Sequence, residues 1–133
     1  LFGLLLQNYA TVNQNSVAID RQVSQMTYLK PVLDWIEKNY TQNIIIDDLA
    51  TVAHLSASYL AHIFKKQLQQ TPLDYLTDVR TLHVQQFLLN TTDSIETITE
   101  LTGFANEKAL TKAFKTKYRL TPHQYRLQRK SRI

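Results

Sequence analysis

The sequence predicts an all-α protein built from two helix-turn-helix subdomains, and three observations support this fold class. The chain of 133 residues holds only 2 glycines and 3 prolines, whereas sheet proteins need many turn residues. Apolar residues recur at helical spacing through most of the chain. A block of about 25 residues also occurs twice, at an offset of 49 to 50 positions, which indicates two copies of one supersecondary unit.

The duplication preserves core and capping residues together. At an offset of 50 residues, the second copy repeats Phe64-Lys65 and Thr71-Pro72-x-x-Tyr75 as Phe114-Lys115 and Thr121-Pro122-x-x-Tyr125. At an offset of 49 residues, it repeats Leu49, Val52 and Leu55 as Ile98, Leu101 and Phe104. The second copy therefore has one extra residue at the start of its longer helix.

Seven helices are expected, in two sets separated by a long linker helix. Residues 28–40 carry an apolar stripe with Pro31 in the first turn. Helices over 47–53 and 57–68, with a tight break between them, form the first helix-turn-helix. A linker helix capped by Thr71 runs from Pro72 to about Leu89. The second copy contributes helices over 95–102 and 106–117 and a last helix that opens at 121–122.

The same periodicity predicts which residues face inward. Gly103 is expected to supply a turn with positive φ, and Asp93-Ser94-Ile95-Glu96 reads as a capping box. In the linker helix and the second unit, the expected inward residues are Leu73, Leu76, Val79, Leu82 or His83, Phe87, Ile98, Leu101, Phe104, Leu110, Ala113 and Phe114. Arg80, in the middle of the linker helix, could pair with an acidic residue of the domain or reach a phosphate, and the role within the fold is favoured.

The charge is concentrated at one end of the chain. The net charge is +4 overall, but residues 105–133 hold nine basic residues and one acidic residue, whereas residues 28–60 carry −2. A basic end indicates a polyanionic partner, either nucleic acid or an anionic membrane. The apolar run of residues 1–6 is far shorter than the ~20 residues of a membrane span, so no span is expected there. Of the two polyanionic partners, we expect nucleic acid and no membrane.

The chain lacks the residues that disulfides, metal sites and catalytic sites require. There is no Cys, which excludes disulfides and thiolate metal sites. The four His residues are scattered and form no HExxH pattern, so neither a metal nor another cofactor is expected. No Gly-rich phosphate loop, nucleophile elbow or paired carboxylates are visible in the sequence, and we expect no enzymatic activity.

The longer helix of each repeated unit combines an apolar face for packing with a polar face. The polar face suits the major groove of DNA, which is about 12 Å wide and accepts an α-helix. The free faces carry Ser58, Ala61, His62 and Lys65 in the first unit, and Glu107, Lys108, Thr111, Lys112 and Lys115 in the second.

The chain resembles the AraC family of transcription activators. The resemblance covers roughly residues 28–126 and rests on many separate blocks with matching spacing, among them Asp48-Leu49-Ala50, Leu55-Ser56-x-Ser58-Tyr59-Leu60-x-x-Ile63-Phe64-Lys65-Lys66, Gly103-Phe104 and Leu120-Thr121-Pro122-x-x-Tyr125-Arg126. It implies two lobes whose recognition helices lie about 34 Å apart and enter successive major grooves. It also implies base-reading positions at Ser58, Ala61 and His62, and at Glu107, Lys108, Thr111 and Lys112.

The chain departs from the usual family pattern at several positions, chiefly Val84, Thr99, Ala105 and Ala109. His62 stands where Arg is frequent, next to a bare Ala61, so we expect weaker direct readout from the first lobe. Phosphate contacts are expected, from side chains or from the backbone N–H groups that open helices, at Lys65, Lys66, Thr71, Lys115, Lys117, Arg119 and Thr121.

The resemblance completes the expected organisation. Residues 1–27 form an N-terminal helical arm or linker, the remnant of an upstream sensory or dimerisation domain. Residues 28–133 form the DNA-binding domain, with a first lobe at 28–71, the linker helix at 72–90 and a second lobe at 91–133. The expected partner is double-stranded DNA, at the nucleoid in the bacterial cytoplasm. RNA polymerase, and a second copy of the chain joined through the upstream domain, are the other partners considered.

Two other readings stay open. A helical module for protein interaction or dimerisation would carry apolar residues on the exposed faces of the longer helices. An enzyme would need a reactive constellation that the sequence does not show. Salt-dependent binding of random duplex DNA would separate the regulator from both alternatives.

Overall fold

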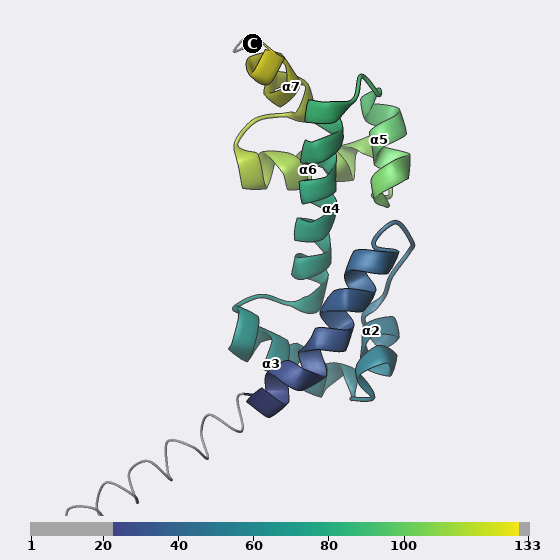
Figure 1. The fold of residues 1–133 in the computed structure, drawn as a ribbon, viewed down its shortest axis with the longest axis vertical. Helices are drawn as coiled ribbons and strands as arrows, with labels where there is room; N and C mark the ends of the chain where they lie inside the picture. Colours follow the sequence, from purple (N-terminus) through teal and green to yellow (C-terminus); the bar gives the residue numbers. More distant parts are fainter. Residues whose placement is uncertain (1–22, 131–133) are drawn as a thin grey trace, which may run out of the picture.

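A computed structural model describes residues 23–130, which form seven helices and contain no strand (Figure 1). This confirms the predicted all-α class, while the arm expected over residues 1–22 lies outside the described residues. The N-terminal helix occupies residues 23–39. It is followed by α2 (Ile46–Ala53), α3 (Ala57–Leu68), α4 (Pro72–Asn90), α5 (Ile95–Thr102), α6 (Glu107–Tyr118) and α7 (Pro122–Lys130).

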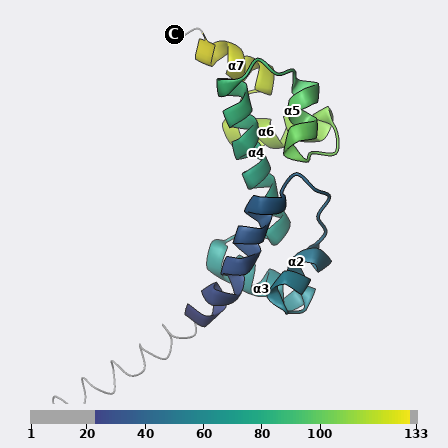
Figure 2. The ribbon, with the colours of Figure 1, turned by 45° about the vertical axis from the view of Figure 1, so that its right-hand side comes forward.

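The helices form two lobes stacked along the long axis of the molecule. Lobe one comprises the N-terminal helix, α2, α3 and the first half of α4, and lobe two comprises the second half of α4 with α5, α6 and α7. In Figure 1, α2 and α5 lie on the right-hand side, while α3 and α6 cross the long axis and end on the left. The view turned by 45° keeps the same order, with one lobe above the other (Figure 2). The predicted pair of helix-turn-helix units is therefore present.

Capping side chains fix where most helices begin. The hydroxyl of Ser56 accepts a hydrogen bond from the Tyr59 amide at 3.2 Å, and Asn106 Oδ1 accepts from the Ala109 amide at 2.8 Å. In α5 the cap is Ser94, which accepts from the Thr97 amide at 3.1 Å. The predicted capping box of Asp93 and Glu96 is therefore wrong: the N-cap lies one residue later, at Ser94, whose hydroxyl caps the third helical amide.

Each lobe has its own hydrophobic core, and α4 contributes to both. Leu76 and Val79 pack in lobe one, whereas Val84 and Leu88 pack in lobe two. The fully buried Phe64 meets Tyr75 edge-on at 5.8 Å between ring centroids, and its counterpart pair, Phe114 and Tyr125, repeats this geometry at 5.3 Å. The repeated sequence thus corresponds to a repeated core.

Leu73 and Leu101 were predicted to face inward but are both 43% exposed; of the alternatives Leu82 and His83, Leu82 is 42% exposed and His83 is half-buried. In α4, the buried Pro72, Leu76 and Val79 define the inward face, and Leu73 lies beside it. In α5, Thr99 and Thr102 are buried instead of Leu101, and their hydroxyls donate to the Ile95 and Ile98 carbonyls at 2.7 Å, so burial leaves neither hydroxyl without a partner. Thr99 and Thr102 correspond to the buried Ala50 and Ala53 of lobe one at the offset of 49.

Pro31 lies in the middle of the N-terminal helix, so the prediction that it occupies a first turn is wrong. Proline removes one helical hydrogen bond, but the turn before it is held by tertiary contacts. Gln25 is 9% exposed and accepts a hydrogen bond from Gln67 Nε2 in α3 at 2.6 Å. The predicted boundary between residues 27 and 28 therefore falls inside a continuous helix.

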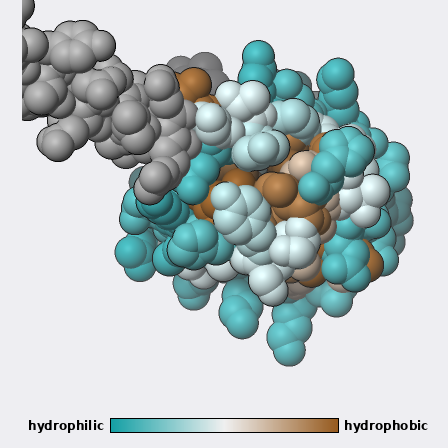
Figure 3. Space-filling model, turned by 90° about the horizontal axis from the view of Figure 1, so that it is seen from below, coloured by the Kyte–Doolittle hydropathy of each residue, from teal (hydrophilic) through white to brown (hydrophobic). Residues whose placement is uncertain are grey.

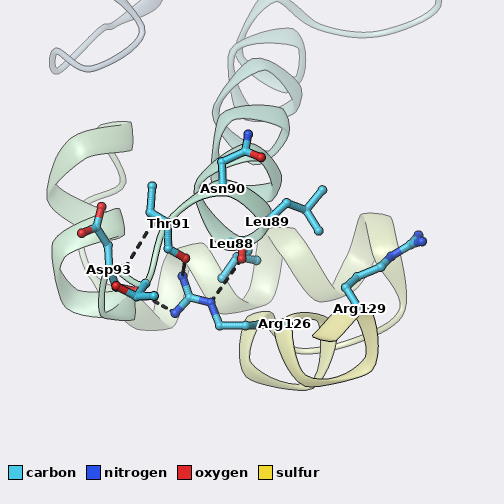
Figure 4. A pocket seen from close by; sticks show the side chains of 8 residues that line it. Leu88, Leu89, Asn90, Thr91, Asp93, Arg126 and Arg129 are labelled. Atoms are coloured by element: carbon cyan, nitrogen blue, oxygen red, sulfur yellow. Dashed lines mark hydrogen bonds between the residues drawn. The ribbon is translucent and has the colours of Figure 1, made fainter. Parts of the chain in front are cut away.

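An arginine in each lobe ties down the segment that precedes the helix-turn-helix. Arg80 donates to the carbonyls of Tyr40 and Gln42 at 2.8 and 2.7 Å, which confirms its expected role within the fold. Burial lowers the pKa of its guanidinium, as expected for a group withdrawn from solvent. In lobe two, Arg126 donates to the carbonyls of Leu88, Thr91 and Asp93, whereas Arg129 points away from them (Figure 4).

Candidate nucleic-acid interface

The free face of α6 gathers five polar side chains around one shallow hollow. The buried Leu110 and Phe114 hold the opposite face of α6 against lobe two, so the orientation of the polar face is fixed. The hollow is lined by Glu107, Lys108, Thr111, Lys112 and Lys115. Thr111 is half-buried and the other four are exposed. The structure therefore brings together all four base-reading candidates predicted in the second lobe, with one phosphate candidate beside them.

The free face of α3 is less charged. Ser58 and His62 are exposed and Ala61 is half-buried, whereas Leu60, Ile63 and Phe64 are buried. Tyr59 is 43% exposed, and its ring stacks beside that of His62 at 6.5 Å between centroids. An exposed aromatic residue next to the recognition positions is a feature that helical spacing alone did not reveal.

His62 and Lys112 occupy equivalent positions of the two recognition helices, 50 residues apart, and both are exposed. The helices that carry them, α3 and α6, cross the long axis of the molecule in the same direction in Figure 1. Binding of one duplex in two successive major grooves requires both helices to be accessible from the same side of the molecule.

The phosphate candidates differ in exposure and in whether their donor groups already have hydrogen-bond partners. Lys65, Lys66 and Lys115 are exposed in the last turns of α3 and α6. Arg119 is exposed in a left-handed conformation after α6, with φ 66°. The amides of Thr71 and Thr121 already donate to side chains in capping boxes, at 3.5 Å to Asp74 Oδ2 and 3.0 Å to Gln124 Oε1.

Acidic residues of α4 lie beside the basic face of α6. Asp78 Oδ1 lies 3.8 Å from the ammonium nitrogen of Lys117, and Asp74 lines the same hollow between α4 and α6 as Lys112. Asp78 and Lys117 are 39 residues apart in sequence, so no local pattern predicts their pairing. The pair partly neutralises one of the lysines expected to bind phosphate.

A polar network inside lobe two supports α6 from behind. Gln85 Nε2 donates to the Tyr125 hydroxyl at 2.6 Å, and the Tyr118 hydroxyl donates to Gln85 Oε1 at 3.3 Å. Burial, followed by the charges of Tyr125 and Asp78, raises the pKa of Tyr118, so its hydroxyl stays protonated as a donor. This network links α4, α6 and α7 through one amide side chain.

A different surface lies at the lower end of lobe one. Figure 3 shows hydrophobic residues gathered near the middle of this end and surrounded by hydrophilic ones. An apolar hollow on this lobe is lined by Val23, Met26, Thr27, Lys30, Pro31, Leu33 and Gln67. It involves none of the recognition positions, so it is a second surface with its own chemistry.

Residues 23–130 offer neither a metal-binding group nor a membrane-spanning helix. Within this range, no group of three or more His, Cys, Asp or Glu residues is placed to hold a metal ion. No helix in the same range is both long and apolar enough to cross a membrane.

Comparisons with known proteins identify what this arrangement is similar to. A family described as a helix-turn-helix domain matches residues 49–128. The melibiose operon regulatory protein of Escherichia coli K12 is 31% identical over 123 residues, which cover 92% of this chain and 39% of that protein. The lactose operon transcription activator of Staphylococcus xylosus is 25% identical over 142 residues, which cover 92% of this chain and 51% of that protein. The chain thus spans about half or less of the length of these relatives.

Solved structures show the same fold. An AraC-type regulator from Chromobacterium violaceum aligns with a TM-score of 0.73 at 25% identity, covering 80% of this chain and 96% of that one. The C-terminal domain of the response regulator yesN from Fusobacterium nucleatum aligns with a TM-score of 0.67 at 32% identity, covering 71% and 93%. The DNA-binding domain of AdpA, solved with a target DNA, aligns with a TM-score of 0.75 at 24% identity, covering 78% and 94%, and this supports the fold alone.

Proposed function

Because the chain belongs to the AraC family of helix-turn-helix transcription regulators, we propose that it binds double-stranded DNA in two successive major grooves and thereby regulates transcription. The observation that carries this proposal is the repeated pair of recognition helices, α3 and α6, whose packed faces are apolar and whose free faces are polar and exposed. A protein-interaction module would instead expose apolar faces on these helices.

The free face of α6 supplies the richer set of groups for base recognition. Lys112 can donate to O6 and N7 of guanine, Glu107 can accept from N4 of cytosine, and Thr111 can meet a thymine methyl group. Lys108 lies on the same face. On α3, Ser58, Ala61 and His62 offer fewer specific contacts, and this supports readout that depends mainly on lobe two.

The remaining exposed cations position the duplex. We place phosphates near Lys65, Lys66, Lys115 and Arg119, which follow the base-reading residues on each recognition helix. Lys117 would exchange Asp78 for a phosphate on binding. Thr71 and Thr121 would contribute through helix N-termini whose first amides are already capped, so they rank last among the phosphate candidates.

The test is a fluorescence anisotropy titration of a labelled 24-base-pair random duplex at 50 and 200 mM salt, followed by selection of a preferred site from a random pool. Affinity should fall at least 30-fold between the two salt concentrations, because each neutralised phosphate releases counterions. Selection should enrich two half-sites about 10 base pairs apart. Binding that is weak, insensitive to salt and without an enriched sequence would overturn the proposal.

Other partners follow from the same proposal. A regulator of this family acts on transcription by contact with RNA polymerase or by exclusion of it, and activation is favoured here because one relative is a transcription activator. The proposed target places the chain at the bacterial nucleoid, in the cytoplasm, and we propose a role in binding without a catalytic step.

We propose that the apolar hollow on lobe one packs against the domain expected upstream, through which a second copy would join. A Met26→Glu substitution in the full-length protein should then weaken dimerisation in sedimentation equilibrium while DNA binding by residues 23–130 stays unchanged. If Met26→Glu dimerises as well as the wild type, the hollow does not pack against the upstream domain.

A further inference from the structure

The two lobes touch at a point away from the helix that joins them. The turn after the N-terminal helix, residues 40–42, lies directly beneath the end of α5 in Figures 1 and 2. Gly103 occupies the turn between α5 and α6 and has φ 83°. A Cβ atom at position 103 would collide with the Tyr40 carbonyl oxygen and lie 2.9 Å from Thr41 Cα. The turn between α5 and α6 in lobe two therefore contacts the backbone of lobe one.

The Tyr40 turn is itself held rigidly against α4. The ring of Tyr40 stacks on His83 with 4.1 Å between centroids and 9° between planes. His83 Nε2 lies 3.8 Å from a carboxylate oxygen of Glu37, and Arg80 Nε donates to the Tyr40 carbonyl at 2.8 Å. The turn that Gly103 meets is thus fixed to the linker helix through the ring contact with His83 and the two hydrogen bonds from Arg80 to the Tyr40 and Gln42 carbonyls.

This second contact changes how the two lobes are oriented. A single helix that joins two lobes can bend and twist, so α4 alone defines the distance between them better than the angle. The contact at Gly103 is a second connection between the lobes, in addition to α4. Two connections restrict the angle between the lobes as well as their distance. One added base pair rotates a half-site by about 35° and shifts it by about 3.4 Å, so recognition of two half-sites is sensitive to that angle.

We propose that Tyr40, Arg80, His83 and Gly103 form an interlobe latch that sets the spacing of DNA half-sites the protein accepts. This inference rests on the proposed DNA binding and assigns spacing specificity to residues that do not touch the duplex. Gly103 is required for two reasons, its positive φ and the close approach of the other lobe. Its counterpart in lobe one, His54, also has a positive φ of 56° but carries an exposed side chain.

The DNA test uses the site selected by the wild-type protein and two derivatives with one base pair inserted or deleted between the half-sites. The wild type should lose at least 30-fold in affinity for each derivative. His83→Ala and Gly103→Ala should lose no more than about fivefold, because a freer angle accommodates both spacings. The matched controls are Gln86→Ala, at an exposed position of the same helix, and His54→Ala, at the other left-handed turn, and both should keep the wild-type loss.

A second measurement needs no DNA. The chain has no Cys, so Thr51→Cys and Glu100→Cys place two spin labels at equivalent exposed positions of α2 and α5. The distance distribution measured by double electron–electron resonance should be narrow in the otherwise wild-type protein and wider or shifted in His83→Ala and Gly103→Ala. An unchanged distribution, or an unchanged spacing penalty in variants with wild-type helicity, overturns the latch. Failure of the wild type to bind DNA would instead overturn the proposed function, while the spin labels still decide the latch.

Discussion

Lobe one and lobe two share a plan but divide their residues differently between core and surface. Among residues 23–130, the buried cluster of lobe one includes twelve residues, eleven in four helices and Ile44 in the loop before α2, whereas that of lobe two includes six. The free face of α6, in contrast, carries three lysines and a glutamate, and that of α3 carries a serine, an alanine and a histidine before its first lysine. The lobe with the larger buried cluster thus has fewer charged side chains on the free face of its recognition helix.

The comparison indicates how a duplicated fold can specialise. Lobe one keeps alanines at positions 50 and 53, where lobe two has threonines that bond back to their own helix. Lobe two joins three of its helices through the Gln85, Tyr118 and Tyr125 network, whereas in lobe one Gln67 donates to the buried Gln25 and so joins two. We interpret lobe one as the stable support that positions the duplex and lobe two as the main reader of sequence.

The largest expected effect separates the two cores. Phe114→Ala should cost lobe two about 3–5 kcal/mol, since a buried aromatic residue leaves a cavity. Trp35, the only tryptophan, packs in lobe one, so its fluorescence should report that lobe while circular dichroism reports both. Urea unfolding of Phe114→Ala should therefore show helicity lost before the Trp35 signal changes. Phe64→Ala is the matched variant and should reverse this order; coincident transitions in both variants would show that the cores are not independent.

The next effect concerns readout. Lys112→Ala should weaken binding to the selected site by about 10- to 100-fold, the range of a good base contact. The equivalent His62→Ala should weaken it less than about fivefold, because α3 is expected to read fewer bases. Anisotropy titrations at one salt concentration measure both. Equal losses at the two positions would contradict the division of roles between lobes.

A smaller effect should be the same in both lobes. Lys65→Ala and Lys115→Ala each remove one expected phosphate contact, so each should lower the slope of log affinity against log salt by about 1. The loss should be similar for specific and random duplexes. A slope that changes for only one of these lysines would place the duplex against a single lobe.

The smallest effect tests the acidic residues behind α6. Asp78→Asn should raise affinity by about two- to fivefold, because it frees Lys117 from an exposed ion pair of the kind worth about 0.2–1 kcal/mol. Glu100→Gln removes the same charge from α5 and serves as the control. If both variants gain equally, net charge and not the pairing of Lys117 explains the change.

Much of the fold could be predicted because its signals are local. Caps such as Ser56 and Thr71, and the spacing of Leu60, Ile63 and Phe64, lie within one helix, and the repeat shows the same signals twice. The wrong predictions concern residues whose burial depends on packing between helices. Leu101 has the right period for burial, but the neighbours of α5 select the face that holds Thr99 and Thr102.

The candidate site was predictable to a similar depth. Periodicity placed Lys112 and its neighbours on one face, and the hollow on α6 gathers them. The pairing of Lys117 with Asp78, the role of Arg126 and the contact at Gly103 could not be predicted, because each joins residues more than 30 positions apart. Whether the predicted residues read bases or phosphates stays a prediction.

The division of α4 between two cores has a consequence for synthesis on the ribosome. The helix begins in the first core and crosses to the second near Thr81, a residue that is 1% exposed. Domains generally fold from the N-terminus as they emerge. Lobe one can therefore assemble while the second half of the chain is still being translated, and it then presents a preformed stretch of helix as the template on which the later lobe condenses.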